Sequence, residues 1–431
     1  MSKSVLIRGG RLIDPSQEID ETTDVLVVDG KIAGLGREAA GSADELIDAG
    51  GLLVAPGLID MHVHLREPGF EDKETIATGT AAAVGGGFTA VACMPNTNPP
   101  LHSDAEIEFV LRQAERDGHT RVYPIGALTK DRAGKQLAEI GLMVRAGAVA
   151  FSDDGDGIAD TGVCLRAMSY VSQFGCLFIQ HCEDKSLTGG GCMSSGVTAT
   201  RLGLPAIPPI AEVIMAQRDI ILAQQAGVRY HVAHASAAGT VDLVRRAKSE
   251  GLSVTTEVCP HHLLLTEEMC SGYDPNYKMN PPLRSQTDLQ ACLEGARDGT
   301  IDCLVTDHAP HLNSEKEVGF QNAPFGIIGL ETALPLFIRA LIDSEVLDWS
   351  RLIAAMSTRP AQLLGVPGGT LRVGSAADVT LIDPEAEWTI DVEKMRSKNR
   401  NTPFDGWYVR GRAVLTMIDG EVRYRLEEAS L

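Results

Sequence analysis

The middle of the chain alternates between short apolar runs and longer stretches with helical spacing of apolar residues. Residues 105–116 and 210–225 carry apolar side chains every three or four positions, as amphipathic helices do. The apolar runs are candidate strands, eight in number, at residues 58–61, 89–94, 121–127, 148–152, 176–180, 230–233, 253–258 and 303–306. Eight strands that alternate with helices predict a closed parallel (β/α)8 barrel.

Both ends of the chain show a different pattern, in which short apolar runs are separated by tight turns. Asp29-Gly30 lies between two such runs near the N-terminus, and Asp419-Gly420 does so near the C-terminus. Asp-Gly favours a hairpin because both residues tolerate positive φ. We therefore expect an α/β protein with a barrel at 55–364 and a small β-sandwich domain assembled from residues 1–54 and 365–431.

In a parallel barrel, the chemistry lies at the C-terminal ends of the strands. His62 and His64 end the first strand, and they point the same way because side chains on a strand alternate. Five of the eight predicted strands end in a residue type that binds metal ions. The other residues of this kind are Asp153 and Asp154 after the fourth strand, His181 after the fifth, His234 after the sixth and Asp307 after the eighth.

Four histidines and two carboxylates suit two divalent ions with a bridging solvent molecule. Any one of these residues alone could be structural, but their common position at one rim favours a metal centre. Asp154 or Asp153 must supply the bridging carboxylate, and the residues themselves do not separate the two. The predicted ligands are His62, His64 and Asp307 for one ion, and His181 and His234 for the other. Imidazole and carboxylate accept zinc, cobalt and manganese alike, and we expect Zn²⁺.

Composition restricts the possible partners and the compartment. The net charge of -20 and the pI near 5.0 oppose binding to nucleic acid or to an anionic membrane, which requires a basic surface. The nine cysteines include no Cys-x-x-Cys pair, which favours buried thiols in a reducing compartment. Residues 1–10 have too short an apolar segment for a signal peptide, and no apolar run is long enough to span a membrane. The expected location is the cytoplasm.

Beyond these residues, several longer segments resemble one known family. They are 60–69 (DMHVHLREPG), 94–97 (MPNT), 151–155 (FSDDG), 181–183 (HCE), 234–236 (HAS), 280–284 (NPPLR) and 306–311 (TDHAPH). Together they resemble the class I bacterial dihydroorotases of the amidohydrolase superfamily, along essentially the whole chain. The resemblance implies a barrel with a small β-sandwich and a centre of two divalent metal ions.

The resemblance also bears on the bridging ligand. Many relatives bridge their metals with a carboxylated lysine after the fourth strand, but residues 136–184 contain no lysine. In the class I bacterial enzymes an aspartate takes its place, and the match falls on Asp154. Asp153 then becomes a neighbour oriented by the same turn.

The implied reaction is the reversible cyclisation of N-carbamoyl-L-aspartate to L-dihydroorotate, a step of de novo pyrimidine (UMP) biosynthesis. By resemblance, Asp307 is both a metal ligand and the general base and acid. Of the two histidines that flank Pro310, we expect His311 to face the ligand and His308 to be structural. A long polar loop at 308–325 is a candidate lid over the site. The implied substrate-binding residues are Arg66, Asn96 and His311 at the carboxylate, with His64 beside them, Asn280 at the ring edge, and the backbone of Phe325 and Gly326.

Two other functions are compatible with these residues. One is a related cyclic amidase that acts on hydantoin or allantoin, although such relatives usually have the bridging lysine. The other is a non-catalytic scaffold for aspartate transcarbamoylase, although such chains typically lose the metal histidines. An active enzyme that also associates with the transcarbamoylase would combine two of these roles, and a homodimer is the default oligomer.

Overall fold

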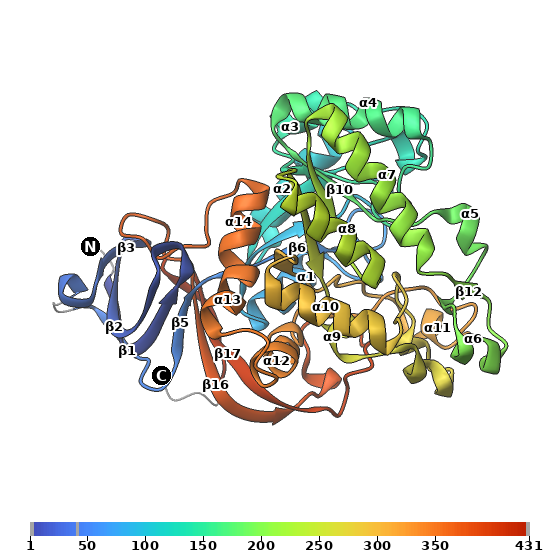
Figure 1. The fold of residues 1–431 in the computed structure, drawn as a ribbon. Coiled ribbons are helices and arrows are strands. Elements are labelled where there is room, and N and C mark those ends of the chain that lie inside the picture. The colour runs from blue at the N-terminus through green and yellow to red at the C-terminus, as the bar shows by residue number, and fades with distance from the viewer. Residues whose placement is uncertain (1–3, 40–42, 428–431) are drawn as a thin grey trace.

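The computed structural model describes residues 4–39 and 43–427, and its centre is a barrel of eight parallel strands (Figure 1). Residues 1–3, which belong to the segment considered as a signal peptide, lie outside the described residues. Each strand pairs with the next one in chain order, so the predicted barrel is confirmed. The strands are β6 (Leu58–Val63), β7 (Phe88–Cys93), β8 (Arg121–Gly126), β9 (Ala150–Phe151), β10 (Leu177–Gln180), β13 (Arg229–Val232), β14 (Val254–Val258) and β15 (Cys303–Leu304).

Helices follow most of the barrel strands and cover the outside of the barrel, as Figure 1 shows. The helices expected at 105–116 and 210–225 are present as α2 (Asp104–Asp117) and α7 (Ile210–Ala226). Within the described ranges, no helix is both long and apolar enough to cross a membrane. The other helices of the barrel region are α1 (Ile76–Gly85), α3 (Ile140–Ala146), α4 (Thr161–Val171), α5 (Lys185–Thr188), α6 (Val197–Leu202), α8 (Ala238–Ser249), α9 (Pro260–Leu264), α10 (Gln286–Asp298), α11 (Asn313–Lys316), α12 (Ala333–Phe337), α13 (Trp349–Ile353) and α14 (Arg359–Leu364).

The predicted β domain from both ends of the chain is also present, as one continuous sheet. Its strands are β1 (Ser4–Asp14), β2 (Ile19–Val28), β3 (Lys31–Leu35), β4 (Glu45–Asp48), β5 (Leu53–Pro56), β16 (Val379–Thr389), β17 (Tyr408–Ile418) and β18 (Glu421–Arg425). The two ends of the chain meet where β5 pairs antiparallel with β16. Both Asp-Gly turns form hairpins with positive φ, at 49° and 77° for Asp29 and Gly30 and at 50° and 74° for Asp419 and Gly420.

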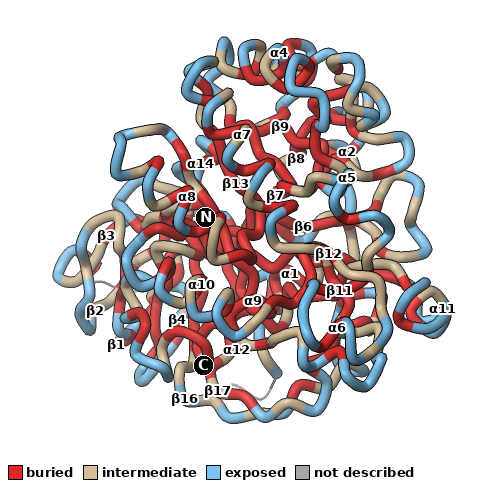
Figure 2. Tube along the Cα trace, turned by 45° about the vertical axis from the view of Figure 1, so that its right-hand side comes forward, coloured by how far each residue is buried: buried red, intermediate tan, exposed pale blue. Residues whose placement is uncertain are grey.

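Burial explains why the barrel strands are continuous apolar runs. Every residue of β6, β7 and β10 is buried, because helices cover one side of these strands and the barrel interior fills the other. Figure 2 shows the buried chain concentrated in the centre of the molecule, with exposed segments on the outer turns. The polar residues at the strand ends are therefore held on a rigid frame.

Hydrogen bonds join the first barrel strand to the last. The carboxylate of Asp60 in β6 accepts from the backbone N–H of Thr306 at 3.1 Å and from that of His62 at 3.0 Å. The backbone N–H of His64 donates to the carbonyl of His308 at 2.8 Å, beside a parallel bridge between Val63 and His308. These contacts bring the ends of β6 and β15 together.

A buried ion pair ties the loops next to the barrel rim. Arg284 Nη2 lies 3.3 Å from Glu212 Oε2, and both side chains are buried. Glu212, in α7, also accepts from the backbone N–H of Ser236 at 3.0 Å, and Arg284 Nε donates to the Ser236 hydroxyl at 3.0 Å. This network fixes the segment that follows His234.

We predict that Arg284→Met strongly destabilises the fold, because it leaves the Glu212 carboxylate buried without its cation. The free energy of unfolding should fall by about 3–5 kcal/mol, as for other broken buried pairs. Urea denaturation followed by circular dichroism measures it. Arg112→Met is the matched control, since the Arg112–Glu108 pair on α2 is exposed and should contribute little. Equal denaturation midpoints for the two variants would contradict the prediction.

Candidate metal centre

The imidazoles at the ends of β6, β10 and β13 converge with two aspartates at the C-terminal end of the barrel. Potential ligand atoms of His62, His64 and Asp307 all lie within 4.8 Å of one another. The same is true of His62, Asp154 and His234. His181 joins them, since its Nδ1 lies 2.9 Å from His234 Nε2. The structure thus brings together all six residues predicted as metal ligands.

Asp154 lies among all four histidines. Its Oδ1 is 3.5 Å from His62 Nε2 and 3.8 Å from both His181 Nδ1 and His234 Nε2. Its Oδ2 is 3.6 Å from His64 Nε2. A carboxylate in this position can place one oxygen toward each of two ions.

Asp307 faces the pair of histidines from β6. Its Oδ1 lies 3.0 Å from His64 Nε2 and 3.5 Å from His62 Nε2. The backbone of Asp307 has a φ of 49°, and that of His234 has a φ of 31°. Non-glycine residues rarely adopt this left-handed region, and strained backbone of this kind is concentrated at functional sites.

The donor atoms fit divalent metal ions. His62 Nε2, Asp154 Oδ1 and His234 Nδ1 are buried, and no hydrogen-bond partner for them is present among the described residues. Unpaired buried polar atoms are costly, and a cation would satisfy them. Burial alone would raise the pKa of Asp154, but the neighbouring charge of protonated His62 holds that pKa well below its usual value, so Asp154 is ionised. A metal ion would displace the His62 proton when it binds. An ionised carboxylate and imidazole nitrogens form a ligand set typical of zinc and similar ions.

Asp153 points elsewhere. Its Oδ1 accepts from the backbone N–H groups of Leu128 and Thr129, at 2.8 Å and 3.0 Å, and its Oδ2 accepts from the Thr129 hydroxyl. The side chain therefore holds the turn after β8. Of the two adjacent carboxylates, Asp154 is the one that faces the histidines.

Two glutamates orient the histidines, and the sequence interpretation did not assign them a role. Glu257 in β14 lies with its Oε1 2.5 Å from His62 Nδ1. Glu183 lies with its Oε2 3.2 Å from His181 Nε2, and it accepts from Asn280 Nδ2 at 2.8 Å. The sequence does contain a sign of this role for Glu257: it is a charged residue within the apolar run 253–258. A carboxylate buried in a strand requires a partner.

Arg66 and Asn96 lie beside the metal ligands. Asn96 Oδ1 is 2.8 Å from His64 Nδ1. Arg66 Nη2 lies 3.3 Å from His311 Nε2, and Arg66 Nε donates to the carbonyl of Pro310 at 3.2 Å. Burial lowers the pKa of Arg66 to about 10, so the guanidinium stays protonated at neutral pH. A buried cation next to the candidate metal centre suits an anionic group of a substrate.

The remaining predicted substrate contacts lie on one rim. His311 Nε2 donates to the carbonyl of Phe325 at 2.8 Å. Asn401, from the C-terminal part of the chain, accepts from the backbone N–H of His311 and donates to the carbonyl of Gly326 at 3.1 Å. Asn401 was missed by sequence interpretation, because nothing in the local sequence indicates that it reaches this rim.

His308 faces away from the metal ligands. The backbone N–H of Gly329 donates to its Nδ1 at 3.1 Å, and its Nε2 lies 3.4 Å from the buried carboxylate of Glu74. The segment 308–325 is not wholly loop, since it contains α11. The Lys316 ammonium in α11 donates to the carbonyls of Pro275 and Pro324, both at 2.9 Å, which packs the segment against the barrel.

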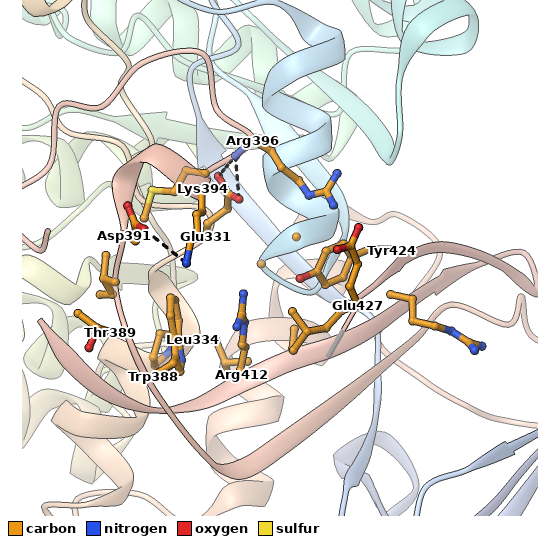
Figure 3. Close-up of a pocket in the computed structure, with 18 residues that line it drawn as sticks. Glu331, Leu334, Trp388, Thr389, Asp391, Lys394, Arg396, Arg412, Tyr424 and Glu427 are labelled. Carbon is orange, nitrogen blue, oxygen red and sulfur yellow. Dashed lines mark hydrogen bonds and ion pairs between the residues drawn. The ribbon is translucent and has the colours of Figure 1, made fainter. Parts of the chain in front are cut away.

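A cavity of about 610 Å³ lies elsewhere in the molecule, between α12 and the strands β16 to β18. Figure 3 shows Glu331, Arg396, Arg412, Trp388 and Tyr424 around it. The Arg412 guanidinium lies 4.6 Å from the Trp388 ring, and that of Arg396 lies 5.0 Å from the Tyr424 ring. None of the predicted site residues lines this cavity, so it is separate from the metal centre.

Comparison with known proteins agrees with this geometry. Residues 50–239 match the family described as dihydro-orotase-like, and residues 209–424 match the amidohydrolase family. The dihydroorotase of Syntrophotalea carbinolica is 50% identical over 98% of this chain and 100% of its own length. The dihydroorotase of Pelotomaculum thermopropionicum is 50% identical over 97% of this chain and 98% of its own length.

Solved structures show the same architecture. The L-hydantoinase (dihydropyrimidinase) from Arthrobacter aurescens superposes with a TM-score of 0.89 at 29% identity, over 100% of this chain and 98% of that chain. The dihydropyrimidinase from Brevibacillus agri NCHU1002 has a TM-score of 0.84 at 24% identity, over 99% and 95% of the two chains, which supports the fold alone. From the identity to relatives along nearly its whole length, the chain belongs to the dihydroorotase family of metal-dependent cyclic amidohydrolases.

Proposed function

We propose that the protein catalyses the reversible cyclisation of N-carbamoyl-L-aspartate to L-dihydroorotate in pyrimidine biosynthesis. The main observation is the position of Asp154 among four histidines, with the buried cation Arg66 beside them. The substrate contains an amide carbonyl to be attacked and a carboxylate that does not react. The candidate metal centre suits the carbonyl, and the guanidinium of Arg66 suits the carboxylate.

We assign zinc as the metal, with two ions in the centre. His62, His64 and Asp307 would hold one ion, His181 and His234 the other, and Asp154 would bridge them. Such a pair, when bound, supplies a hydroxide near neutral pH and stabilises negative charge on the carbonyl oxygen. Glu257 and Glu183 keep the histidine rings in place through their hydrogen bonds.

Asp307 is the proposed general base and acid. In ring opening, its carboxylate takes the proton of the attacking hydroxide and passes it to the ring nitrogen that leaves. Its Oδ1 lies 3.0 Å from His64 Nε2, so the two proposed ligands of one ion face each other at the centre of the site. Because Asp307 also serves as a ligand, proton transfer must be concerted with attack.

The substrate carboxylate is proposed to bind Arg66, Asn96 and His311. A guanidinium can bind a carboxylate through two parallel hydrogen bonds, which fixes orientation as well as charge. Burial and the charge of Arg66 lower the pKa of His311 to about 2, so its ring is neutral and has a single N–H. That N–H donates to the carbonyl of Phe325 in this structure and would turn to the carboxylate when substrate binds. Asn280 would contact the ring edge, with His64 and the backbone of Phe325 and Gly326 completing the pocket.

A cyclic amidase for hydantoins is the second candidate, since the Arthrobacter aurescens structure is similar over the whole chain. Two features of this chain favour dihydroorotate. Residues 136–184 contain no lysine for a carbamate bridge, and Arg66 with Asn96 provides a carboxylate pocket. A hydantoin has no carboxylate at the corresponding position of its ring.

The proposed location is the cytoplasm, and the proposed partner is the small-molecule substrate. A homodimer is the expected oligomer, and association with aspartate transcarbamoylase is compatible with activity. The acidic net charge of -20 opposes nucleic acid as a partner.

Assay of ring opening with dihydroorotate, hydantoin and allantoin tests the proposed activity. We expect turnover of dihydroorotate well above that of the other two. Removal of metal with a chelator should abolish turnover of dihydroorotate, and restoration of Zn²⁺ should recover it. Elemental analysis should find at least two ions per chain. Faster turnover of hydantoin would favour the second candidate. Absence of turnover after metal is restored, in protein that still binds aspartate transcarbamoylase, would favour the scaffold.

Asp307→Asn should reduce kcat for dihydroorotate roughly 10²–10⁴-fold, because the amide cannot accept the proton. The KM should change much less, since the carboxylate pocket is intact. Steady-state kinetics measure both, and elemental analysis shows whether the variant retains its metal. Retention of metal together with near wild-type kcat would rule out Asp307 as the proton carrier.

Arg66→Lys should raise the KM for dihydroorotate roughly 10–100-fold, because a lysine cannot form the paired hydrogen bonds and each such bond contributes about 1.5–3 kcal/mol. The kcat should fall less than the KM rises. Arg112→Lys, on the exposed face of α2, is the control and should leave both unchanged. An unchanged KM in Arg66→Lys would remove Arg66 from the substrate pocket.

A further inference from the structure

A second cluster of potential metal ligands lies directly after β14, where α9 begins. Cys259, His261 and His262 are all buried, and one ligand atom from each lies within 4.8 Å of the others. The two groups around His62 lie within the same limit. The cluster shares no residue with the paired centre, the proposed two-ion site formed by His62, His64, Asp154, His181, His234 and Asp307.

Both histidines of this cluster have a buried nitrogen without a partner. His261 Nε2 and His262 Nδ1 make no hydrogen bond to any residue that the structure describes. The two side chains belong to residues that are only 2% and 4% exposed. Leaving such atoms unpaired costs about 1–3 kcal/mol each, so an ion or water should satisfy them. His62 Nε2 and Asp154 Oδ1 in the paired centre show the same property.

The hydrogen bonding of His262 prepares one nitrogen for a metal. Its Nε2 lies 3.0 Å from the carbonyl of Pro281, and a carbonyl can only accept, so Nε2 carries the hydrogen. In a neutral imidazole this leaves the lone pair on Nδ1. Histidine ligands commonly donate their other N–H to a carbonyl in this way, which fixes the ring. The His261 and His262 rings lie 4.3 Å apart at 63°, so they are not stacked face to face.

The protonation states leave the imidazole of His262 neutral and the thiol of Cys259 protonated. Burial lowers the pKa of His262 to about 4, so its ring is neutral at physiological pH. Burial raises the pKa of the Cys259 thiol, so without an ion the thiol keeps its proton. A metal ion that binds here must displace that proton.

We propose that Cys259, His261 and His262 form a third metal site that binds a single Zn²⁺ ion. One thiolate and two imidazoles are typical zinc ligands, and a tetrahedral ion would have one position left for water. On binding, the S–H bond breaks, the proton leaves to solvent and a sulfur–metal bond forms, without any change in oxidation state. An ion here would hold the turn after β14, the strand that also carries Glu257.

Cobalt substitution tests this site without any assay of activity. Metal-free protein is titrated with Co²⁺, and thiolate-to-cobalt charge-transfer absorption in the near ultraviolet is followed. The ligands of the paired centre include no sulfur, so this absorption reports an ion bound to cysteine. We expect the absorption to saturate at one sulfur-bound ion per chain, with three cobalt ions bound in total. Cys259→Ser should lack the absorption and bind one ion fewer, and His262→Gln should weaken it.

Cys292→Ser is the matched control, because Cys292 is an equally buried cysteine on α10. This variant should keep both the absorption and the third ion. Wild-type protein that is saturated with Co²⁺ but shows no such absorption overturns the proposal, whatever the folding of the variants. Absorption retained in Cys259→Ser overturns it as well. Neither result bears on the dihydroorotate reaction.

Discussion

Contact between the first and last strands of the barrel is the constraint on which the metal centre depends. Asp60 in β6 accepts a hydrogen bond from Thr306, and the backbone of His64 donates to the carbonyl of His308. These bonds place the histidines that end β6 beside Asp307, although His64 and Asp307 are 243 residues apart in the chain. Burial raises the pKa of Asp60 to about 7, so the carboxylate accepts these bonds in surroundings where its charge is disfavoured. Without closure of the barrel, the ligands at the end of β6 would not lie next to Asp307.

Around the ligands, buried and partly buried polar groups form a connected set. Glu257 contacts His62, and Glu183 contacts His181 and Asn280. The buried carboxylate of Glu257 thereby has a partner for a charge that is costly to bury, and each glutamate fixes the orientation of an imidazole. Rigid orientation matters because a metal centre requires its ligands within a few tenths of an ångström of their positions.

Much of this arrangement could be predicted from the sequence, because it follows from local patterns. The continuous apolar runs predicted the eight barrel strands, and the two Asp-Gly pairs predicted both hairpins. The residue types at the strand ends predicted that the histidines converge. The residues alone could not separate Asp154 from Asp153, since only the fold shows Asp153 bound to the turn at Thr129. The contacts of Asn401 with His311 and of Glu257 with His62 could not be predicted from the sequence, because each joins segments that are far apart in the chain. The short helix α11 within 308–325 was also missed, because four residues carry no periodicity.

Anomalous diffraction from crystals of the protein loaded with Zn²⁺ locates the ions and their ligands. We expect two peaks about 3.5–4 Å apart among the four histidines, with one oxygen of Asp154 directed to each ion. His62, His64 and Asp307 should lie at one peak, and His181 and His234 at the other. A single peak in this centre, or a pair bridged by a group other than Asp154, would contradict this arrangement.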